Sequence, residues 1–146
     1  MPEFSDEGIV QFRALLGALL VWQAAIVPAL ADPMTIEFSW RGAQGCVTLF
    51  PNPEIRFRNV PSDAKLVVLT LTQGNRELGG QEVPMPVNGV LPPASIRTYA
   101  PCGPAVYQFT AVAKSNTGKI LAEARQARFY PSDDLVPEKP SQSSDK

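Results

Sequence analysis

Residues Lys65–Thr72, KLVVLTLT, form the stretch that decides the fold of this chain. A short, uninterrupted run of apolar and β-branched residues is typical of a strand that is buried within a sheet. We therefore expect this segment to be a central strand of a sheet. A second strong segment, Tyr107–Ala113 (YQFTAVA), alternates instead, and this pattern predicts a strand whose aromatic and alanine side chains face the core.

Further strands are expected on either side of this pair. Thr35–Trp40 and Glu54–Arg58 alternate between apolar and polar residues. This alternation predicts strands with one buried and one wet face, as in an antiparallel sheet. A weaker strand is predicted at Glu82–Val87, where the prolines restrict it to a sheet edge. Ile96–Tyr99 is predicted to form another short strand.

Ile120–Tyr130, ILAEARQARFY, is ambiguous between helix and strand. Its Ala, Glu, Arg and Leu content favours a helix. Its position directly after the turn Asn116–Gly118 favours the return strand of a hairpin. We interpret it as a strand, with a short packing helix as the alternative.

These short strands predict an all-β fold, a small antiparallel β-sandwich of the immunoglobulin or fibronectin-III type, over residues 32–131. The 15 prolines support this prediction, because most of them separate apolar runs in the way that turns separate strands. Residues 132–146 are rich in proline, serine and charge and lack a hydrophobic pattern. We predict that this tail is disordered.

The apolar run Ala14–Ala31 precedes the predicted domain. It ends in a small-x-small sequence, which predicts an apolar helix that a signal peptidase removes, so that residues 1–31 form a signal peptide. The protein would then be periplasmic or secreted. Its n-region is unusual, because Arg13 is the only basic residue there. The alternatives are an uncleaved membrane anchor at residues 9–31, with the β-domain outside the cytoplasm, and a buried core helix.

Composition argues against most catalytic and cofactor chemistry. The sequence contains no histidine, only 2 cysteines, and neither a GxxxxGK[ST] nor a GxGxxG motif. Thirteen basic residues balance 14 acidic ones, so there is no basic field for nucleic acid. We therefore predict a protein that is not an enzyme, with no catalytic residues, cofactor or metal, and no nucleic-acid partner.

Cys46 and Cys102 are predicted to form a disulfide. Two cysteines in a small exported domain most simply form one bridge. Closing a loop of this length stabilises a fold by about 4 kcal/mol in the chain-entropy model. The alternatives are a thiol that binds copper or takes part in redox exchange, and two unpaired buried thiols.

Two segments carry a resemblance to a known family. PEIRFRNVP at Pro53–Pro61, followed by AKLVVL at Ala64–Leu69, and YAPCGPAVYQF at Tyr99–Phe109 resemble stretches of the phosphatidylethanolamine-binding proteins, which include bacterial Raf-kinase-inhibitor-like proteins. The family's carboxylate motif is replaced by Thr72–Arg76, and its histidine by Ala105. The resemblance implies a reduced member that binds a small anionic or phosphorylated ligand. The residues implied at that site are Arg97, Tyr99, Pro101, Cys102 and Gly103.

A different group of residues points to a protein partner. Trp40 and Arg41 lie near a strand end, and tryptophan and arginine are enriched at interaction hot spots. Arg56 and Arg58 project from one strand face, where they could pair with carboxylate or phosphate. Core packing of Trp40 and a solvated strand face are the plainer alternatives.

The leading hypothesis is therefore an exported module of a bacterial envelope that binds or scaffolds a protein partner without catalysis. The first alternative is the small anionic ligand beside Cys102. The second is a membrane-anchored accessory subunit of a larger complex, in which case the uncleaved N-terminal segment provides the membrane contact.

Overall fold

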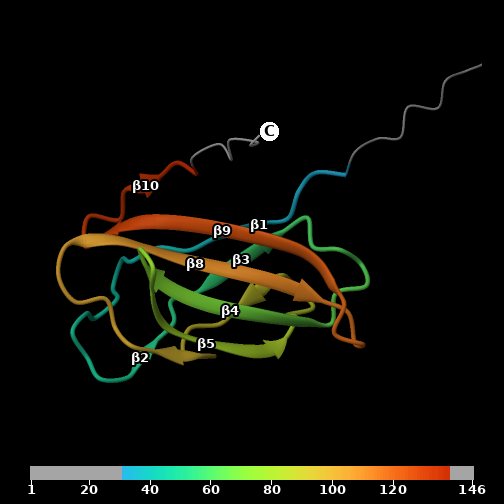
Figure 1. Cartoon of the computed structure of the whole chain (residues 1–146), viewed down its shortest axis with the longest axis horizontal. Coiled ribbons are helices and arrows are strands. Elements are labelled where there is room, and N and C mark those ends of the chain that lie inside the picture. The colour runs from blue at the N-terminus through green and yellow to red at the C-terminus, as the bar shows by residue number, and fades with distance from the viewer. Residues whose placement is uncertain (1–30, 139–146) are drawn as a thin grey trace, which may run out of the picture. The chain divides into compact units, whose positions relative to one another are not determined.

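The computed structural model describes residues 31–138, and these residues form only strands, turns and loops (Figure 1). The signal-peptide and anchor predictions for residues 1–31 fall almost wholly outside this range. Among the residues described, no helix is long and apolar enough to cross a membrane. The strands are β1 (Thr35–Glu37), β2 (Phe50–Pro51), β3 (Ile55–Arg58), β4 (Leu66–Gln73), β5 (Arg76–Pro84), β6 (Val90–Leu91), β7 (Arg97–Thr98), β8 (Ala105–Lys114), β9 (Ile120–Tyr130) and β10 (Leu135–Val136).

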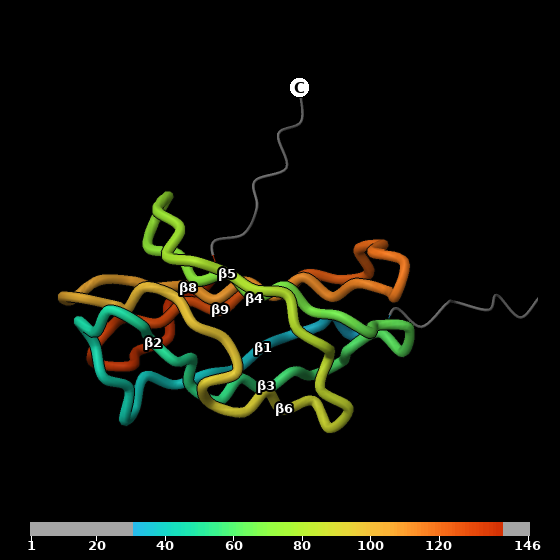
Figure 2. The backbone as a smooth tube through the Cα atoms, turned by 90° about the horizontal axis from the view of Figure 1, so that it is seen from below, coloured from blue at the N-terminus to red at the C-terminus, as the bar shows by residue number. Residues whose placement is uncertain are grey.

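The strands form two layers, which Figure 2 shows edge-on. One layer is an antiparallel sheet in the order β10-β9-β8-β4-β5. The other contains the antiparallel sheet β1-β3-β6, and the short pair β2-β7 lies beside it. The chain is therefore all-β with antiparallel sheets, which is consistent with the predicted sandwich.

Strand β4 is central, as the KLVVLTLT run predicted. It pairs along most of its length with both β5 and β8. Its inward side chains Val67, Leu69 and Leu71 are each 0% exposed. On β8, Tyr107 and Phe109 face the same core, together with the alanines that alternate with them in the sequence. The predicted inward set of β8 is thus confirmed.

Ile120–Tyr130 is a strand, so the preferred interpretation is confirmed. It pairs with β8 from Ala105↔Tyr130 to Lys114↔Ile120. Gly118 adopts φ +84° in the connecting turn, a conformation that glycine accepts without steric cost. The hairpin overrides the helix propensity of this segment, because long-range pairing contributes more than local preference.

Strand β5 is an edge strand, as its prolines predicted, but it begins at Arg76 rather than at Glu82. Its first half contains Gly79 and Gly80, which have no side chains and so give no alternating pattern. The two glycines are required for different reasons: Gly80 is closely packed, and Gly79 adopts φ +128°. A Cβ on Gly80 would lie 2.8 Å from the carbonyl oxygen of Leu69, and one on Gly79 would touch Thr98.

The predicted disordered tail is wrong in its first part. Residues 132–138 belong to the described fold, and β10 pairs with β9 at Leu135↔Arg128 and Val136↔Ala127. Residues 139–146 lie outside the described residues. No hydrophobic pattern marks this segment in the sequence, because the charged side chain of Asp133 holds it in place.

The Asp133 carboxylate binds the segment that follows β1. It accepts hydrogen bonds from the Ser39 hydroxyl and the Trp40 backbone N–H, both at 2.6 Å. An oxygen of the same carboxylate lies 3.6 Å from the Arg128 guanidinium. The carboxylate therefore joins the C-terminal segment to β9 and to the segment that follows β1.

The Trp40 indole lies in the core, and the residue is only 3% exposed. It packs edge-on against Phe38 at a centroid distance of 4.8 Å and also contacts other aromatic rings. These are Phe50, Tyr107, Phe109 and Tyr130, at centroid distances of 6.0–6.1 Å.

The environment of Asp133 predicts how stability depends on pH. Burial raises the pKa of this carboxyl, but the hydrogen bonds from Ser39 and Trp40 and the charges of Arg128 and Arg41 outweigh it, so the pKa lies below the ordinary value of 3.8. A lowered folded-state pKa stabilises the fold above the unfolded value, and this contribution is lost as the pH falls through the folded one.

Asp133→Asn should therefore make the free energy of unfolding depend less strongly on pH in the acidic range. We expect it to lower the free energy of unfolding by about 1–3 kcal/mol near neutral pH, and by clearly less at about pH 2–3. Urea unfolding of wild type and variant at both pH values measures the difference. Asp134→Asn, a change at the exposed neighbour, is the matched control and should show neither effect. An unchanged pH dependence in Asp133→Asn would contradict the assignment.

Candidate functional site

A groove of about 870 Å³ opens where β1 and β3 diverge. Their pairing ends at Glu37↔Arg56. Beyond this point the chain after β1 and the chain before β3 separate. Three segments line the groove. They are the end of β1 and the chain that follows it (residues 37–39 and 41–44), the chain that leads through β2 to β3 (residues 47, 49–54 and 56), and the pair Pro93 and Ala94. Arg128 also lines the groove.

One wall of the groove is apolar and exposed. Leu49 is 64% exposed, and Val47 and Pro51 lie beside it. The buried Asn52 fixes the chain at the other end of this wall, beyond Pro51. Its side chain accepts a hydrogen bond from the Ile96 N–H at 2.8 Å and donates to the Pro92 carbonyl at 3.2 Å. The wall therefore keeps its shape although most of it is loop.

The charged residues around the groove form ion pairs, and that of Arg41 is the longest and involves the most exposed side chain. Glu54 pairs with Arg56 at 2.7 Å, Glu37 with Arg58 at 3.2 Å, and Asp133 with Arg128 at 3.6 Å. Arg41 approaches only Asp133, at 3.9 Å, and its side chain is 90% exposed. Because Asp133 also pairs with Arg128, it offsets the Arg41 charge only in part, and Arg41 leaves partial positive charge at the mouth of the groove.

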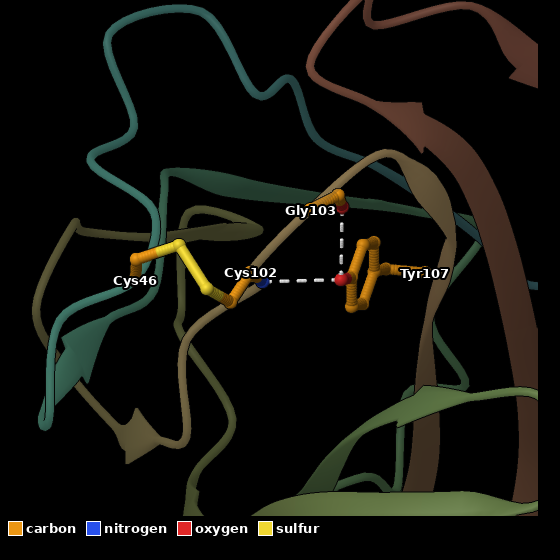
Figure 3. The surroundings of a disulfide bond; sticks show 4 residues. All are labelled: Cys46, Cys102, Gly103 and Tyr107. Atoms are coloured by element: carbon orange, nitrogen blue, oxygen red, sulfur yellow. Dashed lines mark hydrogen bonds between the residues drawn. A yellow bond between two sulfur atoms is a disulfide. The ribbon is translucent and has the colours of Figure 1, made fainter.

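The Cys46–Cys102 disulfide holds the loop that carries the apolar wall (Figure 3). The Cys46 N–H also donates a hydrogen bond to the Pro101 carbonyl at 2.9 Å. Gly45 fits only because it has no side chain, since a Cβ would lie 2.7 Å from that carbonyl oxygen and against the Tyr130 ring. The predicted disulfide is confirmed, and the alternative of two unpaired thiols is wrong. A disulfide is consistent with an oxidising compartment.

The turn that follows Pro101 does not present the backbone that the anion hypothesis requires. The Cys102 N–H donates to the Tyr107 hydroxyl at 3.1 Å, and this hydroxyl donates to the Gly103 carbonyl at 3.2 Å (Figure 3). Pro101 is buried and, like Pro104, has no N–H. Most donors of the turn are thus absent or already used.

A smaller recess of about 290 Å³ lies beside the disulfide. Tyr99 and Cys102 line it, as the resemblance implied, but Arg97 does not. Arg97 is exposed on β7, and the arginine that lines the recess is Arg76, at the start of β5. The five implied ligand residues therefore do not form one site.

The predicted partner-binding residues divide in a similar way. Arg41 and Arg56 both line the groove, whereas Arg58 lies outside its lining. Trp40 is a core residue, so its prediction as a surface hot spot is wrong. The strand alternation places Trp40 on the same inward face as Ile36 and Phe38, and this pattern in the sequence already favoured the core alternative.

The apolar wall and Arg128 were not predicted from the sequence. Leu49 belongs to a loop with no periodic pattern, and Arg128 belongs to the strand whose type was ambiguous. Arg128 faces inward on β9 opposite Tyr107, and its guanidinium lies 5.8 Å from the centre of the Phe38 ring. Their proximity depends on long-range pairing that a single sequence does not show.

Comparisons with known proteins add no assignment to this geometry. No family model, no curated protein and no solved structure matches the chain. The resemblance to the phosphatidylethanolamine-binding proteins therefore stays a prediction. Within residues 31–138, no cluster of three or more His, Cys, Asp or Glu side chains is placed to hold a metal ion.

Removing the disulfide should destabilise the domain and release the groove wall. The cysteines are 56 residues apart in the sequence, so Cys46→Ser with Cys102→Ser should lower the free energy of unfolding by up to about 4 kcal/mol. Urea unfolding measures this, and chemically reduced wild type should lose a similar amount. Trypsin cleavage after Arg41 should become faster under native conditions. A loss below about 1 kcal/mol with unchanged cleavage would contradict this role.

Proposed function

We propose that the chain is an exported, non-catalytic module of a bacterial envelope that binds a protein partner through the groove between β1 and β3. The observation that carries the proposal is the groove itself. It joins an exposed apolar wall to Arg41, whose one ion pair is long and whose side chain is exposed. Exposed apolar surface bordered by polar groups marks interaction sites, and arginine is enriched in them.

The wall of the groove is held in place before any partner arrives. The disulfide anchors its loop near one end, and hydrogen bonds to Asp133 anchor the chain just before the loop. A preformed surface lowers the entropy cost of association, which favours a binding role.

Export is supported by two independent features. The first is the apolar run Ala14–Ala31 with its cleavage-like end, and the second is the disulfide. A non-catalytic role is supported by the amino-acid inventory, because histidine is absent and both cysteines are in the bridge.

The two alternatives have less support from the described residues. A small anionic ligand beside Cys102 would find Arg76 and Tyr99 in the recess, but few free backbone donors. A membrane-anchored accessory subunit depends on residues 9–31, most of which lie outside the described range. Its binding surface would be the same groove.

A photo-crosslinker at Leu49 should capture the partner in the native envelope. Benzoylphenylalanine at this position is expected to give one discrete protein adduct, identifiable by mass spectrometry. Ile120 is the matched control, because it is equally exposed, at 64%, on the β8–β9 hairpin. Arg41→Glu should lower the yield of the Leu49 adduct about tenfold, as loss of one close charge contact does.

Two results would contradict the proposal. One is the same set of adducts from Leu49 and Ile120, which would indicate random contact. The other is a Leu49 adduct that forms equally well in the Arg41→Glu variant and with unrelated envelope proteins. Cells that export the Leu49 and Ile120 variants to the same level provide the comparison.

A further inference from the structure

On both sides of the groove the backbone groups alternate in direction as in a β-ladder, but the pairing of β1 with β3 ends at Glu37↔Arg56. After β1, the Phe38 N–H donates to the Gln126 side chain at 3.0 Å, and the Trp40 N–H donates to Asp133 at 2.6 Å. Both partners lie on the β9–β10 side. Burial continues to alternate here, with Phe38 and Trp40 buried and Ser39 between them half-buried. Successive residues of an extended chain direct their backbone groups to opposite sides, so the backbone groups of Ser39 point toward β3.

On the facing strand, β3, the backbone groups of alternate residues point toward β1. The Phe57 N–H donates to the Gly89 carbonyl at 2.8 Å, which lies toward β6. Arg56 therefore directs its backbone groups toward β1, where it pairs with Glu37. By the same alternation, the backbone groups of Glu54 also point toward β1. In the register of this sheet Glu54 would be the next partner of Ser39, but β1 has already ended.

The sequence explains why the ladder stops at this point. Pro53 directly precedes Glu54, and its ring fixes the φ angle of the chain that enters β3. On the other side, Asp133 holds Trp40 toward the C-terminal segment. The two chains diverge between these constraints. Ser39 and Glu54 then both line the groove rather than pair with each other.

We propose that this gap receives an extended segment of the partner protein, which pairs its backbone with Ser39 or Glu54 and places an acidic side chain against Arg41. Strand addition of this kind derives affinity from main-chain hydrogen bonds and specificity from alternate side chains. Arg41 supplies the charge that selects an acidic residue. Leu49 and Val47 offer apolar contact to the neighbouring side chains of the segment. This inference rests on the proposed function and names its partner chemistry.

Synthetic peptides test the inference directly on the folded protein. An acetylated, amidated hexapeptide that alternates valine and glutamate is titrated into the isotope-labelled protein, and the amide resonances are followed by NMR. We expect saturable shifts centred on Ser39, Arg41 and Glu54. The corresponding valine–lysine peptide should bind at least about tenfold more weakly, and Arg41→Glu should reverse this preference. Arg97→Glu, at an exposed arginine outside the groove, should leave it unchanged.

Backbone N-methylation of the acidic peptide separates strand pairing from simple charge attraction. Methylation at alternate residues removes main-chain donors and should weaken binding at least about tenfold. Equal binding of the methylated peptide would overturn the inference, as would shifts spread over the outer face of β8 and β9. So would the absence of saturable shifts with both peptides.

Failure of the inference is distinguishable from failure of the proposed function. If Leu49 crosslinks to a partner through a helical or folded surface and the peptides do not bind, the proposed function stands and strand addition is wrong. If neither crosslink nor peptide binding occurs, both are wrong.

Discussion

The burial of Trp40 is the constraint on which the rest of the domain depends. Its indole fills the space between the two layers and contacts aromatic rings from β2, β8 and β9. Burying a large aromatic side chain stabilises a fold by about 2–3 kcal/mol, and edge-on ring pairs add about 0.5–1.5 kcal/mol. Its backbone N–H must then be satisfied at the domain border, and the Asp133 carboxylate does this. The C-terminal segment is consequently part of the fold.

The same arrangement determines where the groove lies. The chain leaves the core directly after Trp40, and the disulfide attaches it again at Cys46. Between these points it forms no strand and exposes Arg41. The groove is therefore a consequence of two attachments with a segment between them that forms no strand. Its apolar wall follows the second attachment, in the stretch between Cys46 and β2.

The sequence predicted the parts of the fold that short-range patterns encode. KLVVLTLT indicated a central strand, the alternation in β8 indicated its buried face, and Asn116–Gly118 indicated the hairpin. The bridge between Cys46 and Cys102 followed from the number of cysteines. The start of β5 was missed because Gly79 and Gly80 carry no pattern. The ordered part of the tail was missed because one carboxylate, and no apolar run, fixes it.

The candidate site was predictable only in fragments, since its residues come from segments that meet through long-range pairing. Arg41 and Arg56 were identified as candidates from exposure and residue type, and both line the groove. Trp40 was a candidate hot spot, but its alternation with Ile36 and Phe38 indicated the core role that its burial shows. The family resemblance implied Arg97 beside Cys102, but the fold brings Arg76 there instead.

Hydrogen exchange of the Trp40 backbone amide, measured by NMR, tests the central claim most directly. This amide lies outside the regular strands, so its protection depends on the Asp133 carboxylate and on the buried indole. We expect it to exchange about as slowly as the Phe109 amide in β8, on the order of 10⁴-fold or more below an unprotected amide. Exchange as fast as that of the exposed Thr48 amide in the neighbouring loop would contradict this account.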